Sequence, residues 1–166
     1  LEANFDFDGG PVRMATLGSA VKSDVPAADK RDVVAAGVDM IEQLIGRDEY
    51  GTALSLIPPL LVLSRQVGDK VLTDTLVEQR SRAQAWQRAY DVAKAAMTTL
   101  DDDPDDPNAN LAAGRYLAFI KSDWDAGLAL LAKGGDVPLA AAARAELAAV
   151  ETPDAVLELG DKWAAA

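Results

Sequence analysis

Aspartate side chains are the groups in this sequence whose number and spacing could support chemistry, and calcium binding is the chemistry that they suggest. In the densest run, 101–106, only Pro104 is not an aspartate. A calcium loop between two helices requires glycine at its sixth position and glutamate at its twelfth. Counted from Asp101, those positions hold Asp106 and Ala112. The run therefore does not match a calcium loop, and we interpret it as a solvated linker that caps helices.

A second acidic pattern, near the start of the sequence, matches the first half of the same loop. Asn4, Asp6, Asp8 and Gly9 stand at its first, third, fifth and sixth positions, but Ala15 stands at the twelfth. Without the glutamate that completes the coordination sphere, specific calcium binding is not expected. We predict no metal site in the chain.

Several catalytic chemistries are excluded by residue types that the sequence lacks. The chain has no cysteine and no histidine, which excludes disulfides, Cys/His zinc sites, cysteine nucleophiles and Ser-His-Asp triads within it. Its Gly-Gly pairs at 9–10 and 134–135 match neither phosphate-binding template. The carboxylates fall mostly in turns or on polar helix faces, where solvation is expected rather than acid–base work. We therefore predict that the protein is not an enzyme and has no cofactor.

Composition and charge favour a folded, all-helical protein. The 166 residues are 49% hydrophobic but only 5% aromatic, and their formal net charge is −11. A core of alanine and leucine favours closely packed helices, because strands prefer β-branched and aromatic residues. Nucleic-acid-binding domains normally carry a basic face, so no nucleic acid partner is expected. No apolar run approaches the roughly 18 residues of a membrane span, so no membrane insertion is expected.

Hydrophobic periodicity, glycine and proline divide the chain into helices. The expected segments are 12–21, 29–45, 50–67, 70–100, 107–121, 122–133, 137–150 and 154–166. The segment 50–67 is apolar on nearly all sides, which is typical of a helix in the middle of a stack. Pro58 and Pro59 are expected to kink or split it. Ser122 and Asp125 stand three residues apart and predict a capping box.

The longest segment, 70–100, carries the clearest periodicity. Its seam residues are Leu72, Leu76, Gln79, Ala83, Trp86, Tyr90, Ala93, Met97 and Leu100. A coiled coil and a long helix that packs along its neighbours both produce this spacing. We favour the second interpretation, because glutamine and alanines occupy seam positions. Arg80, Arg82 and Arg88 concentrate positive charge on the same segment, as a solvated face or as a surface for an acidic partner.

The three tryptophans, Trp86, Trp124 and Trp163, are expected mainly in the core or between repeats.

The sequence also contains an internal repeat. The segment 107–114 aligns without gaps with 153–160, sharing proline, alanine, leucine and glycine. Each copy begins a helix with proline and ends on a small residue, where a neighbouring backbone could approach closely. Repetition of this kind is typical of helical hairpins that bury their apolar faces by stacking on one another.

The segment after the acidic run resembles a tetratricopeptide repeat, with Gly114, Ala126, Leu130 and Pro138 near the small and large consensus positions. Residues 105–136 also resemble a helical segment that recurs in Planctomycetes proteins as DPDDPxANLxxGRYLxFxKGDWxxGLxLLAKGSD. That resemblance implies an accessory helical module of larger, often exported, multidomain proteins. It therefore implies a fragment of a longer chain and favours an extracytoplasmic or cell-envelope location.

These observations predict an all-α, tetratricopeptide-like array of about seven helices in antiparallel pairs. A single domain, 1–166, would combine divergent helices over 1–100 with a tetratricopeptide-like part over 101–166. We expect a non-catalytic scaffold or protein–protein interaction module, whose partner is a protein, a peptide or an adjacent domain of the same polypeptide. The resemblance then implies that Asn108, Arg115 and Phe119 face a peptide-binding groove.

The sequence also leaves two alternative functions open. One is a structural spacer that positions a neighbouring catalytic or carbohydrate-handling domain. The other is a module that binds a glycan or small molecule through exposed tryptophans.

Overall fold

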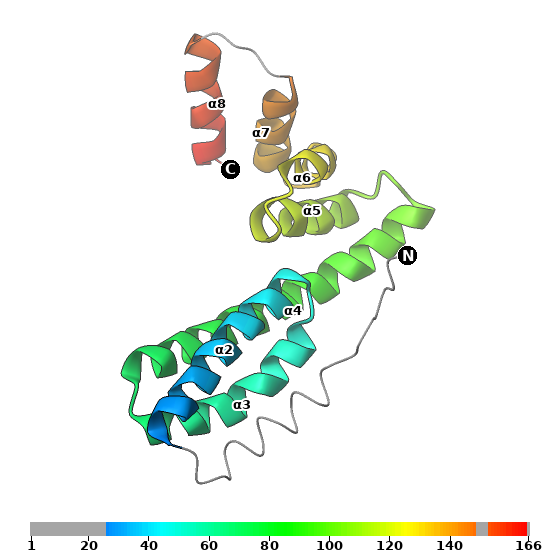
Figure 1. The fold of residues 1–166 in the computed structure, drawn as a ribbon. Helices are drawn as coiled ribbons and strands as arrows, with labels where there is room; N and C mark the ends of the chain where they lie inside the picture. The colour runs from blue at the N-terminus through cyan, green and yellow to red at the C-terminus, as the bar shows by residue number, and fades with distance from the viewer. Residues whose placement is uncertain (1–25, 149–152, 166) are drawn as a thin grey trace, which may run out of the picture. The chain divides into compact units, whose positions relative to one another are not determined.

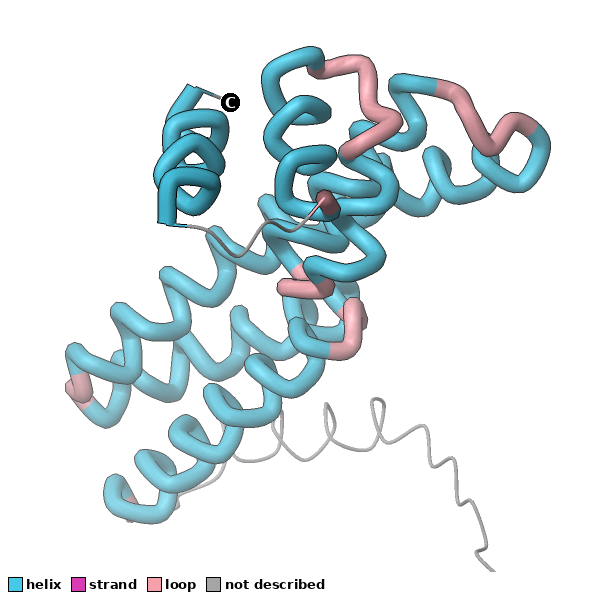
Figure 2. Tube along the Cα trace, turned by 90° about the horizontal axis from the view of Figure 1, so that it is seen from above, coloured by secondary structure: helices cyan, strands magenta, loops and turns pink. Residues whose placement is uncertain are grey.

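The computed structural model describes residues 26–148 and 153–165, and over these residues the chain is all-α (Figures 1 and 2). Seven α-helices and one π-helical turn account for the regular structure of this part, which contains no strand. The chain divides within its longest helix into two compact units, one up to Gln87 and the other from Arg88. We call them the first and the second unit. The expected segment 12–21 and the pattern around Asn4 lie outside the described residues.

The first unit contains α2 (Ala27–Gly46), α3 (Tyr50–Val67) and the beginning of α4 (Lys70–Asp102). These bounds agree closely with the expected segments. Its core consists of fully buried aliphatic side chains from all three helices: Val34, Ile41, Ile45, Leu56, Ile57, Leu60, Leu63 and Leu76. A Cβ on Gly37 would lie 2.6 Å from the side chain of Leu60. Glycine therefore allows α2 and α3 to approach closely.

Of the two effects expected of Pro58 and Pro59, a kink or a split of α3, the split does not occur. The helix continues from Tyr50 to Val67 with Pro58 and Pro59 inside it. Each proline removes a backbone donor, but Pro58 is exposed and buried leucines and isoleucine flank the pair on the core side. The free energy gained by burying the core side of α3 exceeds the cost of the lost backbone hydrogen bonds. The helix is also not enclosed all round, since Val62 is 45% exposed.

Polar contacts explain why a glutamine occupies the seam of α4. Gln79 is buried, and its Nε2 donates a hydrogen bond to the carbonyl of Val38 at 3.0 Å. One turn further, Arg82 forms an ion pair with Glu42 and lies over the ring of Trp86, 5.2 Å from its centroid. The seam thus packs along α2 of the same chain. Arg82 is used in this packing, so it is not part of a free basic surface.

Asp69 fixes the start of α4 and ties it to α2. Its carboxylate accepts a hydrogen bond from the backbone N–H of Leu72 at 3.1 Å and lies 2.9 Å from Nε of Arg31. The Leu72 N–H lowers the pKa of Asp69 below its ordinary value of 3.8, and Arg31 lowers it further against the opposing effect of desolvation. A carboxylate with a lowered pKa stabilises the fold above its unfolded pKa. That stabilisation is lost as the pH falls through the lowered pKa.

We therefore expect Asp69→Asn to reduce stability at neutral pH by an amount that vanishes in acid. Above about pH 5 the difference from the wild type should be constant, and it should close toward about pH 2. Urea denaturation at a series of pH values measures it. Asp32→Asn is the control, because Asp32 is exposed and makes no hydrogen bond or ion pair with the described residues. A pH-independent effect of Asp69→Asn would contradict the electrostatic explanation.

The second unit continues from α4 through α5 (Pro107–Arg115), the π-helical turn η1 (Tyr116–Ile120), α6 (Trp124–Leu131), α7 (Val137–Leu147) and α8 (Pro153–Ala165). Aspartates cap three of these helices. Asp106, Asp123 and Asp136 accept hydrogen bonds from the backbone N–H groups of Ala109, Ala126 and Leu139, respectively. Such caps satisfy backbone donors that a helix start leaves free.

Several details of the expected boundaries in the second unit were wrong. The cap of α6 is Asp123, not Ser122, because Ser122 adopts a left-handed conformation with φ 56° and ends the preceding helical segment. The expected helix 107–121 is α-helical only to Arg115 and then widens into η1, where the N–H of Lys121 bonds to the carbonyl of Tyr116. The helix ends at Leu131 and Leu147 also fall earlier than expected.

Glycine allows α5, η1 and α6 to pack with their backbones close together. A Cβ on Gly114 would lie 2.9 Å from the backbone nitrogen of Leu131, and one on Gly127 would lie 2.7 Å from that of Ala118. Gly160, which the internal repeat aligns with Gly114, has open space around it. The aligned segments both begin α-helices at proline, but only the first contains a glycine required by close packing.

Candidate functional site

An apolar groove of about 550 Å³ lies between the C-terminal part of α4, α5 and η1, all within the second unit. Its lining residues are Arg88, Ala89, Val92, Asn108, Leu111, Ala112, Arg115, Tyr116, Phe119 and Ile120. Beside it, Ala96 of α4 packs against Ala109 and Ala113 of α5. These small side chains bring the two helices together. The groove opens where larger residues follow along both helices.

The three residues singled out from the sequence, Asn108, Arg115 and Phe119, all line this groove. Each has an exposed side chain, and their spacing places them on one face of the helical segment 107–120. The structure therefore brings them together on a single concave surface.

The α4 side of the groove was not identified from the sequence as part of this surface. Arg88 was considered only together with Arg80 and Arg82, and Val92 was not considered because it is not a seam residue. Val92 is 59% exposed. The sequence did contain a signal for this residue. Val92 is a large apolar side chain just outside the seam, and it widens the apolar stripe of the helix beyond the seam.

The charges of the groove are opposite in sign to the net charge of the chain. Arg88 and Arg115 are its charged lining residues, and no carboxylate lines it, although the chain carries a net charge of −11. Arg115 lies 2.8 Å from Asp136, which holds the guanidinium at the α5 rim. Arg88 has no ion-pair partner among the described residues. Within the described residues, the rim on the α4 side thus offers a cation that forms no ion pair.

At the η1 end of the groove, two aromatic lining residues pack against other rings. Tyr116 is buried and its ring centroid lies 5.6 Å from that of Tyr90. Phe119 is 49% exposed and stands edge-to-face with Trp124 at 5.5 Å. A half-exposed phenylalanine held by a second ring presents a preorganised apolar surface.

A shallower hollow of about 330 Å³ continues the groove along α4 and α5. It shares Val92, Asn108 and Ala112 with the groove and extends to Thr99 and Asp106. The combined surface is elongated along the helices. An elongated apolar surface is more suited to a peptide segment than to a compact metabolite.

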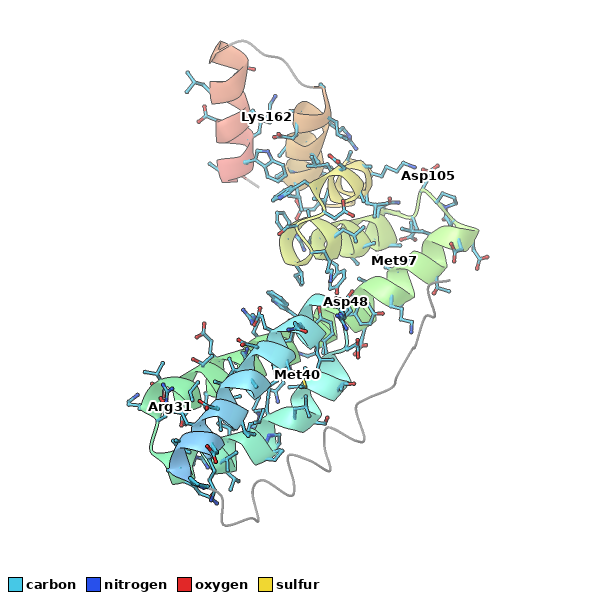
Figure 3. All side chains as sticks on the ribbon, viewed as in Figure 1. Arg31, Met40, Asp48, Met97, Asp105 and Lys162 are labelled. Carbon is cyan, nitrogen blue, oxygen red and sulfur yellow. The ribbon has the colours of Figure 1, made fainter. Side chains whose placement is uncertain are left out.

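The acidic run 101–106 has structural roles in the second unit. Asp106 caps α5, and Asp105, labelled in Figure 3 on the turn before α5, forms an ion pair with Lys133 at 2.9 Å. Within the described residues, no three carboxylates gather closely enough to hold a metal ion. None of the described helices combines the length and apolar character needed to cross a membrane.

The tryptophans occupy intermediate environments rather than the core. Trp86 is half-buried beneath Arg82, and Trp163 is half-buried, with its Nε1 bonded to Glu146 at 3.0 Å. Trp124 remains 45% exposed. Packing between helices is thus observed for Trp124 and Trp163, but burial of Trp124 in a core is not.

In comparisons with known proteins, the chain matches no protein-family model, no curated protein and no solved structure.

Proposed function

We propose that this chain is a non-catalytic protein-interaction module that binds an acidic, apolar-faced peptide segment in the groove of the second unit. The observation that carries the proposal is the combination of an exposed apolar floor with two arginines and no carboxylate lining the groove itself, in a chain whose net charge is −11. The hollow that continues the groove is lined by Asp106, whose carboxylate caps α5. Charge complementarity favours an acidic peptide, because Arg88 and Arg115 at the rim would repel a basic one. Phe119 and Val92 supply the apolar contacts.

The direction of the groove favours a peptide that lies along α4 and α5. An amphipathic helix inserts apolar residues spaced three or four positions apart, and an extended segment inserts alternate residues. In both cases acidic side chains beside the apolar ones would reach the arginines. The segment can belong to a separate protein or to an adjacent domain of the same polypeptide.

The tetratricopeptide resemblance supports the same function, since arrays of helical hairpins bind peptides on concave surfaces. It implies that Asn108, Arg115 and Phe119 face the peptide, and all three line the groove. A tetratricopeptide-like arrangement of the hairpins, and the relation to the Planctomycetes module, belong to this proposal. So does the absence of catalysis, which rests on the missing cysteine and histidine and on the unmatched phosphate-binding templates.

A selection from a random peptide library displayed on phage tests the proposal with the whole chain as bait. Enriched peptides are expected to combine leucine or aromatic residues with aspartate or glutamate. Synthetic copies, titrated by fluorescence anisotropy, should bind more weakly as salt rises, because salt screens exposed charges. Circular dichroism of each variant establishes that it is folded.

Two pairs of variants locate the binding surface. Phe119→Ala should weaken binding of the selected peptides about tenfold or more, whereas Val71→Ala, at a 75% exposed apolar residue of the first unit, should not. Arg88→Glu should weaken binding, whereas Arg80→Glu, on the same helix outside the groove, should not. Failure to enrich any peptide, selection of basic peptides, or equal binding by Phe119→Ala and the wild type would contradict the proposal. The spacer interpretation predicts the first of these results.

A further inference from the structure

A second hollow in the second unit, separate from the groove, is lined by aromatic rings and a carboxylate. It has a volume of about 300 Å³, and its lining residues are Trp124 of α6, Leu128 of α6, Glu146 of α7 and Trp163 of α8. None of them lines the peptide groove. The hollow therefore requires an explanation of its own.

The two indole rings form a corner. Their centroids lie 6.1 Å apart and their planes meet at 87°, and both rings line the hollow. Phe119 stands edge-to-face behind Trp124 at 5.5 Å and 84°. The rings thus support each other from η1 to α8, while Trp124 remains 45% exposed.

Glu146 adds a negative charge to this corner and holds one of its walls. Its Oε2 accepts a hydrogen bond from Nε1 of Trp163 at 3.0 Å. The bond uses the only hydrogen-bond donor of that indole and fixes the orientation of the ring. The carboxylate side chain is exposed at the mouth of the hollow.

This set of groups matches the requirements of an organic cation better than those of a sugar. Quaternary and methylated ammonium groups are recognised by ring faces together with negative charge, and they need no hydrogen-bond donor from the protein. A sugar would need several polar side chains around its hydroxyl groups, but the lining offers Glu146 and indole nitrogens alone. An anion would be repelled by the carboxylate.

We propose that Trp124, Trp163 and Glu146 form a binding site for a quaternary or methylated ammonium group. The cation would lie in the corner between the two ring faces, with the Glu146 carboxylate beside it. The same contacts also join α8 to α6 and α7. Occupation of the site is therefore expected to stabilise the attachment of α8.

Titration of the whole chain with choline, followed by tryptophan fluorescence, tests this site. Trp86→Phe removes the signal of the first unit and leaves Trp124 and Trp163 as reporters. A saturable change is expected with choline. Its uncharged carbon isostere, 3,3-dimethyl-1-butanol, should bind about tenfold more weakly, because it keeps the shape and loses the charge.

Variants separate binding from structural support. Glu146→Gln retains an oxygen that can accept the Trp163 hydrogen bond and removes the charge, so choline should bind about tenfold more weakly while circular dichroism is unchanged. Hydrogen exchange in residues 157–165 should slow on addition of choline to the wild type. Equal responses to choline and its isostere, no response to either, or an unchanged affinity in Glu146→Gln would overturn the proposal. So would a response to glucose or N-acetylglucosamine that choline does not produce.

Discussion

Alanine at Gly127 or Gly114 is expected to destabilise the second unit by about 3 kcal/mol, the upper range for overpacking a close contact. A Cβ at Gly127 would stand 2.7 Å from the backbone nitrogen of Ala118, and one at Gly114 would stand 2.9 Å from that of Leu131. Backbone atoms cannot rotate away as the end of a flexible side chain can. To relieve the overlap, α6 must move away from α5 and η1.

Gly160→Ala is the matched control for both substitutions. Gly160 also lies inside a helix, but nothing stands within 4 Å of its added Cβ. There the higher helix propensity of alanine acts alone and should stabilise by about 1 kcal/mol. Urea denaturation of the Trp86→Phe background, followed by the fluorescence of Trp124 and Trp163, measures the effects in the second unit.

The direction in which each substitution shifts the urea denaturation midpoint tests the close packing of α5 against α6. If Gly114→Ala and Gly160→Ala shifted the denaturation midpoint in the same direction, the close approach of α5 and α6 would be refuted. Hydrogen exchange adds a local readout, because loosening of this contact should raise exchange in α5 and α6 more than in the first unit.

Asn110→Asp is expected to cost about 3 kcal/mol at neutral pH, although the side chain keeps its size. Asn110 is fully buried, and its Nδ2 donates hydrogen bonds to the carbonyls of Pro104 at 3.0 Å and Asp106 at 2.9 Å. These bonds hold the acidic turn onto the first turn of α5. A carboxylate oxygen in place of Nδ2 would face two carbonyl oxygens with no donor between them.

The loss should depend on pH in a defined direction. Burial beside carbonyl oxygens raises the pKa of the introduced carboxyl above its unfolded value. Its protonated form can donate one of the lost bonds, so the deficit should shrink as the pH falls through the raised pKa. Asn108→Asp applies the same change to an exposed residue in the first turn of the same helix, where a negative charge is tolerated or favoured. Similar melting temperatures for the two variants at neutral pH would show that the buried amide does not hold the turn.

The described helices and the aspartate cap of α5 could be predicted from the sequence because local signals determine them. Periodicity identified α4 within two residues of its observed end, and the acidic run with its prolines marked the break before α5. The resemblance to a tetratricopeptide repeat implied that Asn108, Arg115 and Phe119 share a face, and all three line the groove. That this face binds a peptide remains a proposal.

What the sequence did not predict depends on contacts between distant segments. The continuity of α3 through Pro58 and Pro59 follows from burial of the neighbouring leucines against other helices. The different environments of Gly114 and Gly160 depend on which helix lies opposite each. The corner formed by Trp124 and Trp163 joins residues 39 positions apart in α6 and α8, and no local pattern specifies such a pair.

The π-helical turn η1 affects how the chain can be aligned and altered. Its bonding across five positions, as from Lys121 to Tyr116, accommodates one residue more than an α-helical turn. In geometric terms it corresponds to a single residue inserted into the α-helical pattern of 107–120. Residues after η1 are therefore offset by one position from the helical spacing that residues before it follow. An alignment with constant helical spacing would misplace the residues on one side of η1. Deletion of one of the two residues Leu117 and Ala118, which precede Phe119 in η1, is expected to rotate Phe119 away from the groove.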